Sequence, residues 1–478
     1  MKNKEVQMDN MEICRMSALE MRNAIRAKKL SPVELMDAFL QRIERINPKV
    51  NAYCTVVAES ARTEARCAED KLMKGEELGP LHGIPVSVKD LVFTKGIRTT
   101  GGTRMYENFI PDEDDIVVER LKAAGAIVIG KTNTPQSGWV AITDNLLFGP
   151  TRNPWNTERV SGGSSGGAAS AVASCMGPLA IGSDGGGSIR IPSSFCGVFG
   201  LKPSWGRVPH GPGFPGIWEG LSVVGPITRT VKDAALMMEV IAGRDDRDHF
   251  SLPDVELQYL SHLGENLKGL RIAWSSDLGY AIADPQVIEV TEAAARIFNT
   301  LGCTVEAVNP QLGSPEETFS IVVGASLAAV LVDKLDEWRD HFEPALVTFL
   351  EKSKDISAME YIKARINNLE YRNRVQAFFE KYDLLLTPTV AVPPFKVGRY
   401  GPREIAGTRV TPLGWMSFTY PFNITGQPAA SVPCGWTDDG LPVGLQIVGR
   451  RFDEITVLQA AAAFEQASPW ADRIPPLE

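Results

Sequence analysis

From about residue 79 to residue 245 the chain alternates strand-like apolar runs with glycine- and proline-rich turns and with helices. The runs IPVSVKDL (84–91) and AIVIG (126–130) are predicted to be buried strands, and VVERLKAAG (117–125) is predicted to be the helix before the second of them. Strands joined through a helix are the building units of a layered α/β fold. We therefore predict an α/β fold, with a large mixed β-sheet core covered by helices in an α/β/α sandwich.

The rest of the chain divides by its pattern into three further parts. Residues 1–75 show helical spacing and are predicted to be an N-terminal helical part, while 76–245 form the α/β core. Residues 246–380 are charged and mainly helical in pattern, which predicts a helical insertion. Residues 381–478 contain three further strand patterns and a final amphipathic helix, at 383–392, 430–435, 443–449 and 454–467. These strands are expected to rejoin the core sheet, so that all parts form one large domain.

Charge and cysteine content exclude several classes of protein. The 478 residues carry 49 Lys and Arg against 58 Asp and Glu, a formal net charge of −9, whereas nucleic-acid binding normally needs a basic face. The seven scattered cysteines form no CxxC pair, so neither a disulfide framework nor a zinc site is indicated, and a cytoplasmic location is expected. The N-terminal MKNKEVQMDNMEIC lacks the apolar segment of a signal peptide, and the apolar run 320–332 is too short to cross a bilayer. We expect neither a nucleic-acid nor a membrane partner.

The segment GAIVIGKT (125–132) matches the phosphate-binding pattern G-x-x-x-x-G-K-[ST] letter for letter. A phosphate loop needs its four middle residues to point N–H groups at the ligand, but here they are Ala, Ile, Val and Ile, which favour a buried strand. Pro135 also disfavours a helix directly after the motif. We interpret Gly125 and Gly130 as the ends of a core strand, with Lys131 beyond it, so a nucleotide-binding function is the weakest alternative.

A second motif, GGSSG (162–166), fits the nucleophile elbow G-x-S-x-G centred on Ser164. Such an elbow requires a histidine base and an acid later in the chain. None of the histidines after it follows a predicted strand beside an obvious acid: His210, His249, His262 and His341. A histidine-based triad is therefore a minor alternative.

Lys89 stands at the end of the strand predicted over 84–91, where a lysine is rare unless it has polar partners. One interpretation is that its flexible stem carries the amine out to water. The other is a desolvated lysine whose pKa has fallen far enough for it to act as a base. The residues alone leave both interpretations open.

Three segments together resemble the amidase signature family of serine hydrolases: PVSVKD (85–90), GGSSGG (162–167) and SDGGGSIRIPSSFCGVFGLKPS (183–204). The segments TNTPQSG, FGPTRNPWN and PFNITGQPAASVPCG are similar to that family's pattern as well. The resemblance extends from about Ala18 to the last helix. It implies the amidase signature fold and a hydrolase that uses neither a metal nor another cofactor.

The resemblance implies a Ser-Ser-Lys triad, with Ser188 as the nucleophile, Ser164 as the bridging serine and Lys89 as the base. It also implies a cis peptide bond between Gly163 and Ser164. In this scheme neutral Lys89 receives a proton from Ser188 through Ser164, and Ser188 attacks the carbonyl to form an acyl-enzyme. This assignment replaces the elbow interpretation, in which Ser164 was the nucleophile.

The glycines before Ser188 have no Cβ, so their N–H groups can converge on the negative oxygen of a tetrahedral intermediate. We expect this oxyanion hole at Gly185, Gly186 and Gly187, together with the N–H of Ser188. Supporting hydrogen bonds around these groups are expected from Ser165, Ser183, Asp184 and Arg190. Gly185 stands where relatives commonly carry bulkier residues, which is expected to loosen the cradle or to admit a wider substrate.

The substrate is expected to be apolar. Relatives that release ammonia from glutamine for a tRNA-charging partner carry an acid about five positions before a proline, where this chain has Met416 before Pro421. Pocket residues are expected in the insertion 246–380 and in Gly/Pro-rich loops at 205–220 and 399–418, with four candidates: Trp139, Trp218, Trp415 and Met416. We therefore expect a monomer or homodimer that resembles aryl acylamidases and nylon-oligomer hydrolases and cleaves apolar or aryl amides, with carbamates (urethanes) and esters as extensions. The alternative is the glutamine-hydrolysing subunit of a tRNA-dependent amidotransferase.

Overall fold

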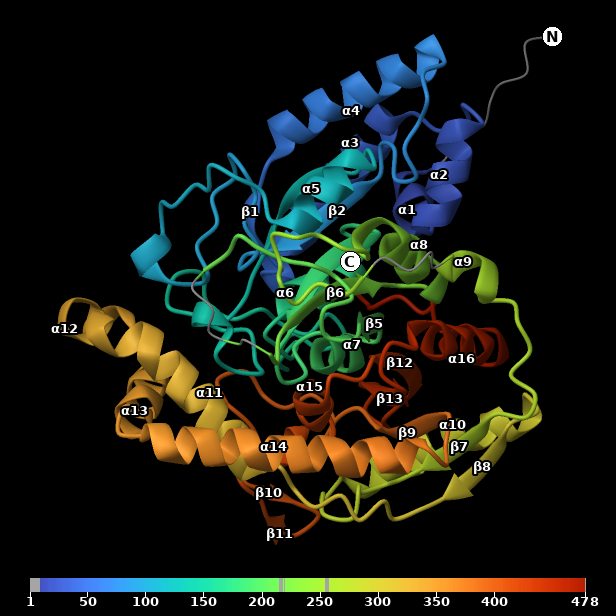
Figure 1. Ribbon diagram of the computed structural model, residues 1–478. Coiled ribbons are helices and arrows are strands. Elements are labelled where there is room, and N and C mark those ends of the chain that lie inside the picture. Colours follow the sequence, from blue (N-terminus) through green and yellow to red (C-terminus); the bar gives the residue numbers. More distant parts are fainter. Residues whose placement is uncertain (1–8, 215–217, 219, 254–257, 478) are drawn as a thin grey trace.

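Eleven strands of the described chain form one mixed sheet through the middle of the molecule (Figure 1). The computed structural model describes residues 9–214, 218, 220–253 and 258–477. Across the sheet the strands follow the order β1-β3-β2-β4-β6-β5-β12-β13-β9-β7-β8. Their bounds in that order are Tyr53–Val56, Ile127–Thr132, Pro85–Lys89, Leu179–Asp184, Val223–Thr228, Phe199–Lys202, Ala429–Trp436, Pro442–Gly449, Leu384–Pro388, Arg271–Trp274 and Thr304–Ala307; a separate hairpin pairs β10 (Glu404–Ile405) with β11 (Thr408–Arg409).

The sheet contains two parallel stretches separated by an antiparallel one, and its edge strand β1 pairs antiparallel with β3. β2 pairs in parallel with both β3 and β4, and β7 pairs in parallel with β8 and β9. From β4 through β6, β5, β12 and β13 to β9, each pair of neighbours is antiparallel. The C-terminal strands β12 and β13 therefore continue the core sheet beside β5, and the predicted α/β fold with a large mixed sheet is confirmed.

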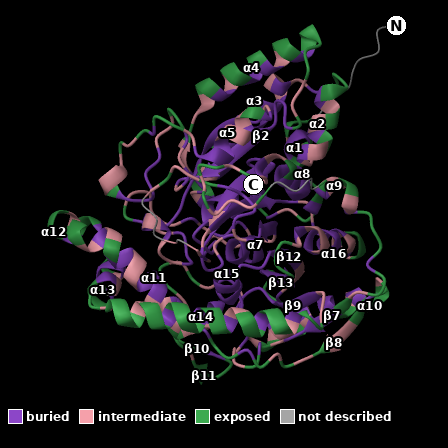
Figure 2. Cartoon of the chain, viewed as in Figure 1, coloured by how far each residue is buried: buried purple, intermediate pink, exposed green. Residues whose placement is uncertain are grey.

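Helices cover both faces of this sheet. In β9, Leu384 and Leu386 pack in the apolar core that includes α10 and α16, whereas Leu385 packs in the core that includes α11 and α14. Alternate strand residues point to opposite faces, so the sheet is buried on both sides, while the outer faces of α4 and α14 are exposed (Figure 2). The helices are α1 (Asn10–Arg15), α2 (Ala18–Arg26), α3 (Pro32–Val50), α4 (Ala58–Lys74), α5 (Ile116–Ala123), α6 (Gly166–Ala173), α7 (Arg190–Cys196), α8 (Val231–Ile241), α9 (Tyr259–His262), α10 (Pro285–Thr300), α11 (Glu316–Leu331), α12 (Leu335–Trp338), α13 (Pro344–Ser353), α14 (Ala358–Phe379), α15 (Pro421–Thr425) and α16 (Glu454–Ala467).

The segment 246–380, expected to be a helical insertion, holds α9 to α14 and also two strands. β7 and β8 extend the sheet beyond β9 and form its last two positions. Each is four residues long, and the exposed or half-buried residues of β8 give it no apolar run. Their pairing with β9 is a tertiary contact that local periodicity does not reveal.

One helical run, Glu316–His341, is long and apolar enough by composition to cross a membrane, and it extends beyond the apolar segment 320–332 singled out in the sequence. It begins with α11, which packs against α13 and α14 and buries Phe319, Val323 and Leu327. A core helix passes the same composition test, so this run alone is weak evidence for a membrane span.

The phosphate-loop match at 125–132 falls on β3, whose six residues are all buried. Ile127 and Val128 pair in parallel with β2, and the last three residues of the segment pair antiparallel with β1, so the segment forms part of the sheet and not a loop. The interpretation as a core strand is confirmed. Lys131, expected beyond the end of the strand, lies inside it.

Candidate active site

Two parallel strands and two helix starts bring the serines and the lysine together. Lys89 ends β2 and Asp184 ends β4, and the two strands are paired in parallel with Val88 opposite Ile181. Their carboxyl ends therefore lie at the same edge of the sheet, which is where α/β enzymes commonly build sites. Ser164 lies just before α6, and Ser188 lies just before α7.

The amine of Lys89 is completely buried and surrounded by serines. Its Nζ lies 2.7 Å from Ser164 Oγ, 2.9 Å from Ser165 Oγ and 3.0 Å from Ser183 Oγ, and 3.4 Å from the carbonyl oxygen of Ser183. Burial lowers the pKa of Lys89 to about 7, against a smaller opposing effect of Asp184. The sequence left open whether the amine of Lys89 reaches water or is desolvated; in the structure it is desolvated.

The two serines of the candidate triad lie on one cavity. The Gly163–Ser164 peptide bond is cis, as the resemblance implied. Ser164 is buried and Ser188 is half-buried, and both line the cavity. Ser165 donates its N–H to the carbonyl oxygen of Ser188 at 3.2 Å, which joins the two serine loops. Within the described residues, Ser188 Oγ has no hydrogen-bond partner. The hydroxyls of Ser164 and Ser188 are therefore not hydrogen-bonded to each other in this structure.

Asp184 and Arg190 support the glycine loop, residues 185–187. Both side chains are buried, and Arg190 Nε and Nη2 donate to the two carboxylate oxygens of Asp184, each at 2.9 Å. Burial alone would raise the pKa of Asp184, but the guanidinium of Arg190 holds it well below its usual range. Arg190 also donates to Thr419, Gln446 and Asn423, which ties the loop to α15 and to the C-terminal strands.

The N–H groups of the loop have different partners. Gly187 donates its N–H to Asp184 Oδ1 at 2.7 Å, and its φ of +130° lies in the region that favours glycine. The N–H groups of Gly185, Gly186 and Ser188 have no acceptor among the residues that the structure describes. Among the described residues, three N–H groups of the loop are therefore without an acceptor, whereas that of Gly187 is engaged.

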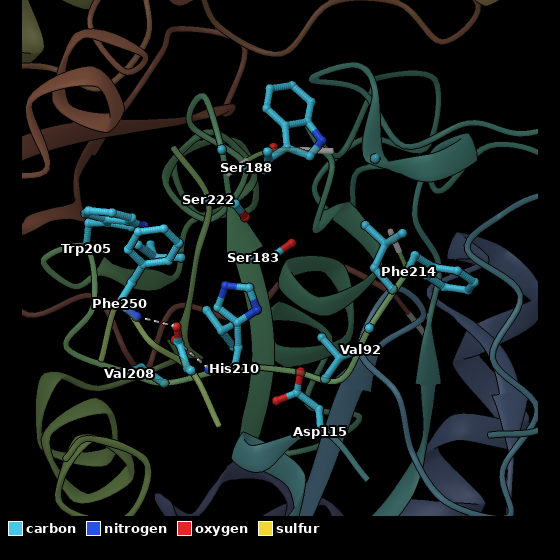
Figure 3. Close-up of a pocket in the computed structure, with 18 of the residues that line it drawn as sticks. Val92, Asp115, Ser183, Ser188, Trp205, Val208, His210, Phe214, Ser222 and Phe250 are labelled. Atoms are coloured by element: carbon cyan, nitrogen blue, oxygen red, sulfur yellow. Dashed lines mark hydrogen bonds between the residues drawn. The ribbon is translucent and has the colours of Figure 1, made fainter. Parts of the chain in front are cut away.

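The cavity has a volume of about 400 Å³ and aromatic walls (Figure 3). Among the residues expected to form the pocket, Trp218 lines it, whereas Trp139, Trp415 and Met416 are not among its lining residues. Trp415 is 1% exposed and stacks on Phe195, and Trp139 packs against other aromatic rings. Positions 215–217 and 219 of the loop 205–220 lie outside the described residues.

Several lining residues were not singled out from the sequence. They are apolar or titratable side chains that the fold brings from four parts of the chain: Val92, Asp115, Trp205, Val208, His210, Phe214, Asp248 and Phe250. The composition of the loop 205–220 pointed to part of this set. Nothing local marked Asp115, which caps the start of α5.

Within the described residues, Lys131 and the histidines, which the competing motifs brought into question, are not hydrogen-bonded to the two serines of the candidate triad. Lys131 is buried and donates to the carbonyl oxygen of Val92 and to the hydroxyls of Thr94 and Thr99, so it fixes the segment after Lys89. His210 lines the cavity, but no described histidine ring is hydrogen-bonded to Ser164 or Ser188. The described residues also contain no group of three or more His, Cys, Asp or Glu side chains that could hold a metal ion.

Comparisons with known proteins agree over nearly the whole chain. A family model described as Amidase matches residues 34–458. The chain is 40% identical over 465 residues to an acylamidase from Rhodococcus erythropolis, covering 96% of this chain and 97% of that protein. It is 38% identical over 483 residues to a glutamyl-tRNA(Gln) amidotransferase subunit from Carboxydothermus hydrogenoformans, covering 95% and 98%. The crystal structure of a bacterial aryl acylamidase matches with a TM-score of 0.91 and 34% identity, covering 96% of this chain and 98% of that one.

The fold and these matches define an amidase, a hydrolase that acts on amide C–N bonds. The chain belongs to the amidase signature family, as its motifs indicated.

Proposed function

We propose that this amidase cleaves apolar or aryl amides through an acyl-enzyme on Ser188, with Ser164 as the bridging serine and Lys89 as the base. The observation that carries the proposal is the 2.7 Å contact between the buried amine of Lys89 and Ser164 Oγ, beside the half-buried Ser188. A buried amine whose pKa is about 7 is uncharged in about half of the molecules at neutral pH.

The proposed reaction moves one proton along the triad and back. Ser188 Oγ attacks the carbonyl carbon while its proton passes to Ser164, whose own proton passes to the uncharged amine of Lys89. The proton then returns along the same path to the nitrogen of the leaving amine, and the C–N bond breaks. Water repeats the sequence on the acyl-enzyme and releases the carboxylic acid. Ser165 and Ser183 orient the amine of Lys89 throughout.

For the oxyanion, the proposal uses the N–H groups of Gly185, Gly186 and Ser188. The N–H of Gly187, also expected as a donor, is already given to Asp184, so its proposed role is to shape the loop. Each well-placed donor in such a site contributes about 3–4 kcal/mol to the transition state. Asp184 and Arg190 are proposed to position these donors.

The proposed substrate preference rests on the cavity walls. Trp205, Phe214 and Phe250 offer flat apolar surfaces in the cavity that the two serines line. Such walls suit the aryl or alkyl groups of acylamides, and the named relatives include an acylamidase and an aryl acylamidase. Carbamates and esters are proposed as further substrates because the same carbonyl is attacked. We propose a cytoplasmic enzyme that acts as a monomer or homodimer.

The second candidate function is glutamine hydrolysis within a tRNA-dependent complex, which the similarity to a glutamyl-tRNA(Gln) amidotransferase favours. Free glutamine carries an α-carboxylate that a binding site would pair with Arg or Lys. The described residues that line the cavity include neither. This favours the acylamidase function.

The purified chain alone, incubated with an anilide, a primary amide, a carbamate and glutamine, tests the proposal. We expect turnover of the anilide, and loss of at least three orders of magnitude in kcat in Ser188→Ala and Lys89→Ala. Ser174→Ala is the matched control, because Ser174 is a buried serine outside the site whose hydroxyl has no hydrogen-bond partner among the described residues. Anilide hydrolysis that survives Ser188→Ala contradicts the triad, and turnover of glutamine only with added partners supports the second candidate.

A further inference from the structure

The cavity that contains Ser188 has two ends of different chemistry (Figure 3). Ser188 lies at one end, and Asp115 lies at the other, with His210 between them. Apolar side chains form the walls along this path, with Val92 and Phe214 on one side and Trp205, Val208 and Phe250 on the other. A substrate longer than its amide group therefore reaches from an apolar region into an acidic one.

Two carboxylates give the remote end its charge. Asp115 is 3% exposed and accepts the N–H groups of Val117 and Gly211, one on each oxygen and each at 2.9 Å. Asp248 accepts the N–H groups of His210 at 3.3 Å and Phe250 at 3.0 Å. These backbone bonds fix both carboxylates in place, and each oxygen retains a lone pair for a ligand.

Within the described chain, neither carboxylate forms an ion pair with lysine or arginine, and the described lining of the cavity contains neither residue type. Asp184, which precedes the glycine loop, differs in this respect, because its carboxylate forms a buried ion pair with Arg190. Asp115 and Asp248 both line the cavity; burial raises the pKa of Asp115, and the nearby His210 and Lys131 oppose this rise. The backbone partners of the two aspartates are neutral dipoles, which stabilise the carboxylates without cancelling their charge.

We propose that this cavity selects amides that carry a primary ammonium group remote from the scissile carbonyl, and that it rejects amides with a carboxylate in the same place. The inference rests on the proposed function, since it assumes that the scissile carbonyl lies at Ser188. The apolar walls bind the carbon chain between the two groups, and Asp115 and Asp248 bind the ammonium. Each carboxylate attracts a substrate ammonium and repels a substrate carboxylate at the same distance. The attraction and the repulsion therefore both increase the ratio of kcat/KM for the ammonium substrate to that for the carboxylate substrate.

Three 4-nitroanilides with the same four methylene groups before the terminal group test this selection: 5-aminopentanoyl, hexanoyl and 5-carboxypentanoyl. A second series places the same three terminal groups on the amine side of butanamide, because either half of the substrate can occupy the remote end. The assays are run at pH 8, because burial raises the pKa of Asp115 to about 6 and its carboxylate is ionised at the higher pH. In at least one series we expect kcat/KM for the ammonium compound to exceed that for the carboxylate compound by roughly 100-fold at low salt.

Variants assign the effect to the two residues. Asp248→Asn and Asp115→Asn each lower the ammonium-to-carboxylate ratio by about tenfold, and asparagine preserves the helix cap at position 115. Asp246→Asn is the matched control, because Asp246 lies in the same loop as Asp248 but is 80% exposed and pairs with Arg244. It leaves the ratio unchanged. A ratio near one in both series, or equal effects of the three variants, overturns the inference.

Binding separates this inference from the proposed function. Calorimetry with Ser188→Ala and the corresponding primary amides measures charge selection without any turnover. Charge-selective binding by a protein whose wild type hydrolyses no anilide leaves the selection intact and rejects the proposed function. Turnover of all three anilides with equal kcat/KM, and equal binding, rejects the selection alone.

Discussion

The indole of Trp218 lies directly on Gly185. A Cβ atom at Gly185 would come within 2.9 Å of Trp218 Cε3, closer than real Cβ contacts occur, and within 3.1 Å of Trp218 Cδ2. The sequence suggested that a glycine here loosens the loop or widens the site. The ring of Trp218 occupies that volume instead, so glycine at this position is matched to an aromatic wall of the cavity.

Gly185→Ala is therefore expected to displace Trp218 and to lower kcat/KM for a neutral anilide by about tenfold or more, the usual effect of overpacking by one methyl group. Trp218→Leu in the same chain makes room for the new Cβ and recovers part of the loss. A double-mutant cycle on kcat/KM measures this coupling. Additive effects of the two substitutions would show that the contact has no influence on the reaction.

The pH profile of kcat follows the protonation of Lys89 in the proposed mechanism. The base must be uncharged, and burial lowers the pKa of Lys89 to about 7, so activity rises with pH and levels off above about 8. At pH 6 we expect about a tenth of the maximal rate. Initial rates between pH 5 and pH 9 check this, with unfolding monitored in parallel. A profile that falls across this range is incompatible with a neutral lysine base.

Arg190→Met is expected to destabilise the fold as well as the loop. It leaves the fully buried carboxylate of Asp184 without its cation, and breaking a buried pair in this way costs about 3–5 kcal/mol. Arg296→Met removes a surface pair of 71% and 43% exposed side chains, for which about 0–1 kcal/mol is expected. Urea-unfolding midpoints of both variants give the comparison; similar midpoints would mean that Asp184 is compensated by its other donors.

Lys131→Met tests the role of the second buried lysine near the site. Lys131 Nζ donates to Thr94 Oγ1 at 2.8 Å and to Thr99 Oγ1 at 3.0 Å, and methionine retains the stem but not these bonds. We expect a loss of about 1–3 kcal/mol in unfolding free energy from the unsatisfied partners, with an unchanged pH midpoint of activity. A shifted midpoint would show that Lys131 influences the charge state of Lys89.

Much of the fold is encoded locally. The runs around Lys89 and Ile129 have the apolar pattern of central strands, and β2 and β3 occupy those positions. The serines and the lysine were identified because they lie in a long motif. The burial of Trp415 depends on residues far away in sequence, such as Phe195, on which its ring stacks. Asp115 became a lining residue only because the loop containing Gly211 folds against the start of α5.

β2 lies between β3 and β4 in the sheet, so substitutions at this strand would disturb backbone pairing on both of its sides. Lys89 ends β2, the glycine loop follows β4, and the spacing between them is set by backbone pairing of the sheet. Most of the cavity walls come instead from connecting segments, among them the loop with Trp205 and Phe214, although Val223 and Val224 belong to β6. Recombining or randomising those segments can change what the enzyme accepts, while the sheet keeps the proposed catalytic groups at the same spacing. In directed evolution of this enzyme, libraries are therefore best placed in the wall segments, and the strands are best left unchanged.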